Sequence, residues 1–197
     1  MTALYLLRHG ETEWSRTGRH TSYTDLPLTP TGERRAGDAG RLLGHLRGAR
    51  RPALVASSPR VRALRTAELA GLTADLVTEE LAEWNYGEYE GLSTPQIRET
   101  VPQWTVWTHP SPGGESAHDV EARAARVVAR ARAALDDGDV ILVGHGHFSR
   151  VVVATWLGLA ATAGVHFALD AASLTVLGDE RGTPRITRLN VPPALDQ

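Results

Sequence analysis

The chain has 197 residues, of which 42% are hydrophobic and 22% charged, and its formal net charge is −2, a balance typical of a soluble globular protein. All 21 basic residues are arginine, because lysine is absent. Cysteine is absent as well. These absences exclude Schiff-base chemistry, a Walker-type phosphate loop, disulfides, thiolate nucleophiles and cysteine metal sites. The near-neutral charge and the lack of long apolar runs argue against binding to nucleic acid or a membrane.

The first half of the chain alternates between predicted strands and helices. Residues 4–7 are apolar and stop at Arg8-His9-Gly10, as a buried strand does where it meets a polar loop. The following elements are predicted from apolar spacing and cap residues: a helix from Thr29-Pro30-Thr31 to about Gly48, a strand over 53–56, a helix capped by Ser57-Ser58-Pro59 that runs through Leu69, a short strand over 74–77, a loop over 83–91 and a short helix over 95–99.

The second half continues the alternation. A helix is predicted over 120–135, and its four arginines (Arg123, Arg126, Arg130 and Arg132) are interpreted as a solvated face. A β-branched strand over 140–143, a helix to Leu157 and strands over 172–177 and 186–189 follow. The pattern predicts one α/β domain over residues 1–197, a three-layer αβα sandwich with a largely parallel central sheet flanked by helices.

Two predicted strands end in a histidine. Strand 4–7 leads to His9 and strand 140–143 leads to His145, and ligands bind at this carboxyl edge in α/β folds. Strand 53–56 brings Arg60 to the same edge, so two histidines and two arginines, Arg8 and Arg60, are expected to converge. Arginine forks match phosphate oxygens and histidine can form a covalent intermediate at phosphorus, so the expected ligand is a phosphoryl group.

A leaving alcohol needs a proton donor, and Glu83 is the candidate. The flanking Trp84 and Tyr86 could remove water from the carboxyl group and favour its proton-donating form. His145-Gly146-His147 could be a metal-ligand pair, but no acidic residue follows closely enough to complete a hydrolase site. We therefore expect neither a metal nor another cofactor.

The chain resembles the histidine phosphatase superfamily, which includes phosphoglycerate-mutase-like and acid phosphatase members. Arg8-His9-Gly10-Glu11-Thr12, Ser58-Pro59-Arg60, Glu83 with Gly87 and Gly91, and Gly144-His145-Gly146 occur in the order of that family. The resemblance implies that His9 is the nucleophile, that Glu83 donates and accepts the proton, and that Arg8, Arg60 and protonated His145 bind the phosphoryl group.

The resemblance also implies a substrate-binding mouth. Thr12, Ser15, Thr21 and Ser22 are expected near the phosphate and Tyr86 beside the leaving group. Apart from the resemblance, the choice of substrate is expected to depend on the shape of a mouth formed by Thr21, Tyr86, residues 104–116 and His147. Family members commonly have asparagine in place of Ser15 and glycine in place of Ser22, so these two positions depart from the family pattern.

A phosphatase acting on a small phosphorylated metabolite is the favoured function, because the chain has no room between Gly91 and Glu115 for the additional segments of phosphoglycerate mutases. Sugar bisphosphatase and mutase activity are the alternatives within the family. Outside it, Gly144-x-Gly146-x-x-Ser149 partly matches a dinucleotide-binding loop, although too few residues follow to complete that domain. A catalytically silent module that binds phosphorylated metabolites is a further alternative.

The sequence also bears on location and assembly. The first residues, Met1-Thr2-Ala3-Leu4, lack a basic segment followed by an apolar export core, which favours a cytoplasmic protein. Trp104 and Trp107 belong either to the core or to the interface of a homo-oligomer, and the core is the commoner place for tryptophan. The oligomeric state therefore stays open.

Overall fold

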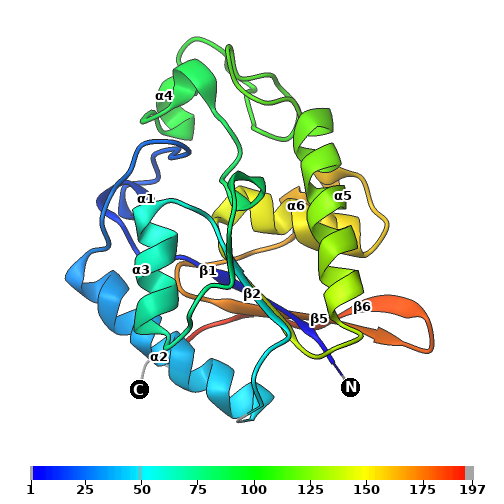
Figure 1. Ribbon diagram of the computed structural model, residues 1–197. Coiled ribbons are helices and arrows are strands. Elements are labelled where there is room, and N and C mark those ends of the chain that lie inside the picture. Colours follow the sequence, from blue (N-terminus) through cyan, green and yellow to red (C-terminus); the bar gives the residue numbers. More distant parts are fainter. Residues whose placement is uncertain (1, 49, 194–197) are drawn as a thin grey trace.

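A six-stranded sheet forms the centre of the computed structural model, which describes residues 2–48 and 50–193 (Figure 1). Its strands are β1 (Leu4–Arg8), β2 (Leu54–Ser57), β3 (Leu76–Val77), β4 (Val140–Gly144), β5 (Leu174–Glu180) and β6 (Thr183–Val191), in the order β3-β2-β4-β1-β5-β6. β1, β2, β3 and β4 are parallel, whereas β5 and β6 form an antiparallel hairpin at one edge. The predicted largely parallel sheet is thus confirmed.

Helices cover both faces of the sheet (Figure 1). The α-helices are α1 (Glu13–Arg16), α2 (Pro30–Arg47), α3 (Val61–Leu69), α4 (Thr94–Arg98), α5 (Ala117–Ala134) and α6 (Gly146–Trp156), and the 3-10 helices are η1 (Glu79–Leu81), η2 (Gly87–Tyr89) and η3 (Ala161–His166). α2 and α3 pack on one face and α5 and α6 on the other, which confirms the αβα layers. Throughout the described ranges, no helix is both long and apolar enough to cross a membrane.

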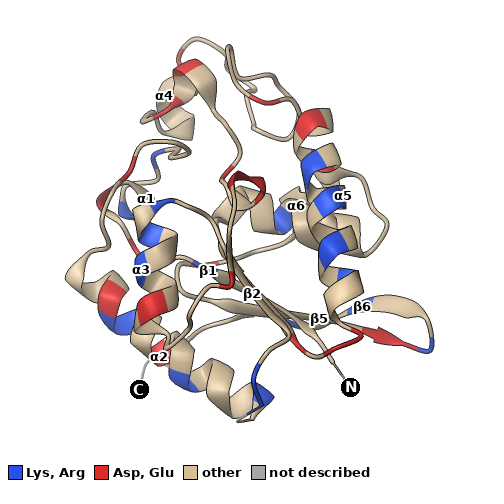
Figure 2. Cartoon of the chain, viewed as in Figure 1, with Lys and Arg blue, Asp and Glu red and all other residues tan. Residues whose placement is uncertain are grey.

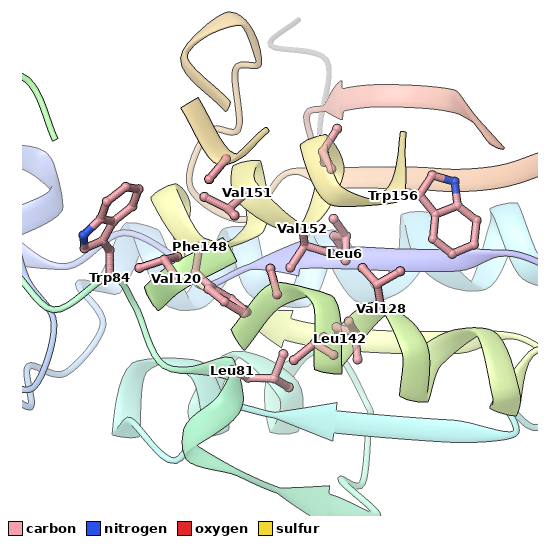
Figure 3. Packing of buried hydrophobic residues seen from close by; sticks show 14 of the residues in the cluster. Leu6, Leu81, Trp84, Val120, Val128, Leu142, Phe148, Val151, Val152 and Trp156 are labelled. Carbon is pink, nitrogen blue, oxygen red and sulfur yellow. The ribbon is translucent and has the colours of Figure 1, made fainter. Parts of the chain in front are cut away.

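Alternation along the central strands explains the two hydrophobic layers. In β1, Leu6 packs toward α5 and α6, whereas Leu7 packs toward α2 and α3, because successive strand residues point to opposite faces. Figure 3 shows the first layer, where Leu6 and Leu142 of neighbouring strands meet Val128 of α5 and Val152 of α6. Burying each side chain of this size contributes about 1.5–3 kcal/mol to stability, so this layer holds the strand ends in a rigid frame.

Most predicted element ends are confirmed, but the start of α3 is a correction. The Ser57-Ser58-Pro59 cap was expected to begin this helix, with proline in its first turn. Instead α3 begins at Val61, and its first residue donates its N–H to the carboxylate of Asp25 at 2.7 Å. The capping acid comes from a loop remote in sequence, so the local pattern had no signal for it. The short elements α1, η1, η2 and η3 were also not predicted.

The arginines of α5 require a second correction. Figure 2 shows basic residues recurring along this helix, and Arg126 and Arg130 are exposed and pair with Glu80, as a solvated face predicts. Arg132 is exposed too, although its guanidinium carbon lies 4.0 Å from the ring centre of Trp156. Arg123 is buried and bonds to the segment around Glu83. Three of the four arginines therefore fit the prediction, and Arg123 does not.

The two tryptophans that could have marked an interface are buried. Trp104 is 1% and Trp107 7% exposed, and both belong to the core cluster beside α5 and α6. Trp107 meets Trp84 edge to face, with 5.6 Å between ring centres. They are core residues, which was the commoner of the two expectations.

Candidate active site

Strand register brings His9 and His145 together. β1 and β4 pair in parallel with Arg8 opposite Gly144, so the next residue of each strand is a histidine at the same edge. The two imidazole rings lie 5.1 Å apart between centres at an interplanar angle of 63°. β2 ends beside them, because Ser58 donates its N–H to Val143 and its hydroxyl lies 2.7 Å from Nε2 of His145.

The protonation of His9 follows from one hydrogen bond and its surroundings. Nδ1 lies 2.7 Å from the carbonyl oxygen of Gly10, which can only accept, so Nδ1 carries the proton. Burial, and then the charges of Arg62 and Arg8, lower the pKa of His9 well below its ordinary value. The neutral ring therefore has its lone pair on Nε2, the atom available to attack an electrophile.

His145 is completely buried. Burial lowers its pKa well below the ordinary value, and the charges of Arg62, His9, Arg60 and Arg8 lower it further. Burial and these cations favour the neutral ring, whereas the protonated His145 that we expect belongs to the complex with the phosphoryl group. Its Nδ1 is buried and has no partner among the described residues.

Arg8 is the last residue of β1, and its side chain lies against the start of α6. One of its terminal nitrogens donates to the carbonyl of Leu169, and its Nε is buried without a partner in the described part of the chain. A β-carbon at position 146 would lie 3.3 Å from the guanidinium carbon, tighter than an ordinary contact. Glycine at 146 therefore lets the guanidinium lie directly against the first turn of α6.

Arg62 is a site residue that the sequence reasoning missed. Its side chain is completely buried in the first turn of α3, where it donates to the carbonyls of Thr21, Ser22 and Thr24 at 2.9–3.2 Å. Apart from burial, its charge is the strongest influence on the pKa of both His9 and His145. Helical spacing could have identified it, because Thr66 one turn later accepts the N–H of Gly10 and marks the face of α3 that meets β1.

Arg60 lies at the edge of this group. It is the residue before α3, and its guanidinium pairs with Glu79 at 2.9 Å. Together with Ser22 and Glu83 it lines a second cavity of about 220 Å³. Its charge contributes to the low pKa of His145 but ranks behind burial and the charges of Arg62 and His9.

The carboxyl group of Glu83 is fixed by backbone donors at the start of α6. One oxygen accepts the N–H groups of Trp84 (2.9 Å) and Phe148 (2.7 Å), and the other accepts the N–H of His147 (3.0 Å). Trp84 and Tyr86 are buried as expected, and Glu83 itself is 7% exposed. A helix N-terminus, rather than the aromatic neighbours alone, sets the orientation of this carboxyl group.

A cavity of about 290 Å³ unites three of the five catalytic candidates with part of the predicted mouth, whereas Arg60 and the fully buried His145 are not among its lining residues. Its described lining includes seven of the predicted site residues, namely Arg8, His9, Ser15, Thr21, Glu83, Tyr86 and His147, and also Arg19, His20, Thr94 and Arg150, which were not predicted. A larger polar groove of about 980 Å³ along α2 shares only Arg8 and Ser15 with it. The smaller cavity is therefore the candidate active site.

Three predicted mouth residues form hydrogen bonds within the protein. Thr12 and Ser15 cap α1 reciprocally, since each side chain accepts the other's backbone N–H at 3.1 and 2.9 Å. Ser22 donates its hydroxyl to Glu90 at 2.6 Å and faces the 220 Å³ cavity. Thr12 and Ser22 thus shape the loops around the site, whereas Ser15 reaches the 290 Å³ cavity.

The outer wall of the cavity is an aromatic cluster with two further histidines. The hydroxyl of Tyr86 lies 2.7 Å from Nδ1 of His147, and His20 packs 4.7 Å from the ring of Tyr86. Burial lowers the pKa of His20 to about 4 and that of His147 well below its ordinary value, and burial raises the pKa of Tyr86. This wall is consequently uncharged near neutral pH.

The donor set suits an anion. Over residues 2–48 and 50–193 no group of three or more histidine, aspartate or glutamate side chains is arranged to hold a metal ion. The buried nitrogens that lack protein partners belong to arginine and histidine and include Nε of Arg8 and Arg62 and Nδ1 of His145. Arginine nitrogens are hydrogen-bond donors that match phosphate oxygens.

Comparison with known proteins finds relatives along nearly the whole chain. The model of the histidine phosphatase superfamily (branch 1) matches residues 4–192. An acid phosphatase of Mycobacterium tuberculosis is 50% identical over 188 residues, which cover 95% of this chain and 92% of that protein. Sedoheptulose 1,7-bisphosphatase of Saccharomyces cerevisiae is 32% identical over 181 residues, with 78% of this chain and 67% of that protein covered.

A solved structure shows that the likeness extends to the whole fold. The structure of an open reading frame of Mycobacterium tuberculosis superimposes with a TM-score of 0.95 at 49% identity. The alignment covers 98% of this chain and 99% of that one. Both the sheet and its connections are therefore shared.

Proposed function

The chain belongs to the histidine phosphatase superfamily and is a phosphatase, and on this premise we propose that it hydrolyses small phosphomonoesters through a phosphohistidine on His9. The observation that carries the proposal is the hydrogen bond from Nδ1 of His9 to Gly10, at 2.7 Å. It leaves Nε2 unprotonated in a pocket where the charges of Arg62 and Arg8 act most strongly on the ring. A neutral nucleophile in a cationic pocket suits attack on a phosphate dianion.

We propose that Arg8, Arg62 and His145 bind the phosphoryl oxygens. Each of the three has a buried nitrogen without a partner in the described part of the chain, as Arg60 also has at Nε. Arg62 is preferred to Arg60 because its charge acts more strongly on both histidines, and it is added to the residues expected from the sequence. A bound dianion would raise the pKa of His145, because an opposite charge favours the protonated ring. Arg60, paired with Glu79, would then act on this site as a more distant charge.

Glu83 is the proposed acid and base. In the first step Nε2 of His9 bonds to phosphorus, the bond from phosphorus to the alcohol oxygen breaks, and Glu83 gives its proton to that oxygen. In the second step Glu83 takes a proton from water, the resulting hydroxide oxygen bonds to phosphorus, and the bond from phosphorus to His9 breaks. Inorganic phosphate leaves and no metal enters the cycle.

Phosphatase activity and mutase activity differ in the acceptor of the phosphoryl group. The experiment is an assay of purified protein on a panel of phosphorylated metabolites, including sugar bisphosphates and 3-phosphoglycerate with and without 2,3-bisphosphoglycerate. We expect release of inorganic phosphate and no interconversion of phosphoglycerates. Interconversion at a rate above phosphate release would favour a mutase, and failure to hydrolyse any monoester between pH 4 and 9 would favour a silent binding module.

The remaining expectations stay proposals. We propose that residues 1–197 act as one catalytic domain, which is consistent with the match of the family model over 4–192. A cytoplasmic location would be tested by fractionation, and a homo-oligomer by light scattering of the purified protein. Among the panel substrates, sugar bisphosphates test the alternative that the 32% identical bisphosphatase suggests.

A further inference from the structure

The segment that carries Glu83 has no regular structure of its own. η1 ends at Leu81 and η2 begins at Gly87, and residues 82–86 between them form neither helix nor strand. Buried backbone groups need hydrogen-bond partners, so such a segment must find them elsewhere in the fold. Its partners are concentrated on two charged side chains, Arg123 of α5 and Glu115 just before α5.

Arg123 binds the carbonyl side of this segment. One terminal nitrogen donates to the carbonyls of Ala82 at 2.7 Å and Glu80 at 3.0 Å, and the other reaches the carbonyl of Glu83 at 3.4 Å. The residue is 9% exposed. A single guanidinium therefore binds the backbone just before Glu83 and the backbone of Glu83 itself.

Glu115 binds the other side of Glu83 and also fixes Arg123. Its carboxylate accepts hydrogen bonds from Nε and a terminal nitrogen of Arg123, at 3.0 and 2.8 Å. It also accepts a hydrogen bond from the N–H of Asn85, at 2.9 Å. Its backbone pairs with the same segment, since its N–H donates to Asn85 and its carbonyl accepts the indole N–H of Trp84, both at 2.9 Å. The residues before and after Glu83 are thus tied to one ion pair.

The same guanidinium also contacts the donors of the Glu83 carboxyl group. It lies over the ring of Phe148 with 4.1 Å between the guanidinium carbon and the ring centre. Phe148 in turn donates its N–H to Glu83 at 2.7 Å. Arg123 therefore connects the backbone of Glu83 to the helix end that orients its side chain.

We propose that Arg123 and Glu115 are positioning residues that align the carboxyl group of Glu83 with the leaving-group oxygen. The inference rests on the proposed role of Glu83 as the acid. Neither residue lines the 290 Å³ cavity, and both line the 220 Å³ cavity behind Glu83, so they act through Glu83 rather than on the substrate. A misplacement of about 1 Å in a catalytic group can cost about 100-fold in rate, so a small relaxation of this segment is enough to slow proton transfer.

The test separates positioning from simple stabilisation by varying the leaving group. Arg123→Met keeps much of the apolar stem but removes the fork, and kcat/KM is measured with glycerol phosphate and with 4-nitrophenyl phosphate. We expect the loss on the alkyl ester to exceed the loss on the aryl ester by at least about tenfold, because a phenolate leaves with little protonation. The matched control is Arg126→Met, on the same helix but exposed and paired only with Glu80 among acidic residues, which should leave this ratio unchanged.

A double-variant comparison strengthens the test. In a Glu83→Gln background, Arg123→Met should lower kcat/KM for the alkyl ester by less than about threefold, because residues that act through one group are not additive. Arg123→Lys should restore only part of the alkyl-ester activity, since a single ammonium cannot reproduce the fork. Glu115→Gln supplies the same comparison if Arg123→Met does not fold, as judged by circular dichroism.

Each outcome decides one claim. Equal losses on the two esters in folded Arg123→Met and Glu115→Gln, or full additivity with Glu83→Gln, would overturn the positioning role. If Glu83→Gln by itself shows no leaving-group dependence, the proposed acid is wrong instead, and the failure lies with the proposed function.

Discussion

The imidazole rings of His9 and His145 pack edge to face, with 5.1 Å between their centres, at the ends of two neighbouring parallel strands. Burial and the charge of Arg62 lower the pKa of both rings, so the pair is neutral although arginines surround it. This arrangement combines a base that is ready to attack phosphorus with donors that match its oxygens. The first predictions concern this balance of charge.

The rate of His9 phosphorylation should persist at acidic pH. His9 reacts as the neutral ring, and its lowered pKa moves the protonation that would inactivate it to pH values below 6.5, the ordinary histidine pKa. Rapid-mixing measurements with 4-nitrophenyl phosphate, corrected for ionisation of the substrate, check this. A rate that falls with a midpoint at or above 6.5 would contradict the assignment.

Stability should decline as the pH falls below about 6.5. His9, His20, His145 and His147 all have lowered pKa values, so between the folded and unfolded pKa the unfolded chain binds more protons. The free energy of unfolding then decreases by up to about 1.4 kcal/mol per pH unit for each histidine. Urea titrations from pH 8 to 4 measure the slope, and His20→Gln should reduce it by about one proton.

Arg62 and Arg60 should differ strongly as phosphate-binding residues. Replacing one preorganised donor at a reacting anion commonly costs about 10²–10³ in kcat, which is the loss we expect for Arg62→Lys. Arg60→Gln should cost less than about tenfold, because Arg60 pairs with Glu79 and its charge acts less on His145 than that of Arg62 does. Steady-state kinetics of the two folded variants check the order, and a larger loss at Arg60 would restore the expectation from the sequence.

Glu83→Gln should slow alkyl phosphates far more than aryl phosphates. General acid catalysis typically contributes about 10²–10⁴-fold, and this contribution is needed only where the leaving group is a poor one. The glutamine retains an oxygen that can accept the N–H of Phe148 or His147, so the local fold should persist. The measurement is kcat/KM for glycerol phosphate against 4-nitrophenyl phosphate, and equal losses would exclude Glu83 as the acid.

Strand and helix patterns predicted the architecture because each element carries its own signal. The apolar run before His9 and the β-branched run before His145 are short, buried strands, and their parallel pairing follows from the alternation with helices. The meeting of His9 with His145 was therefore predictable from sequence alone. The antiparallel pairing of the edge hairpin was not predicted, and the segment that leads into it supplies the carbonyl of Leu169 that accepts a hydrogen bond from Arg8.

Side chains whose partners are remote in sequence were not predictable. Asp25 caps α3 and Arg123 holds the Glu83 segment, and each does so through a contact made only in the folded chain. Arg62 is the instructive case, because an arginine in a helix usually points to solvent. In the local sequence only its position one helical turn before Thr66 distinguishes it from Arg60. The neutral state of His145 likewise depends on burial and on several charges that converge only in three dimensions.

Identification of the phosphorylated residue tests the central claim most directly. Enzyme quenched during turnover of 4-nitrophenyl phosphate should carry phosphate that is labile in acid and stable in base, located on His9 by mass spectrometry, with His9→Ala carrying none and showing no turnover. Phosphate on any other residue, or turnover by His9→Ala, would contradict the account.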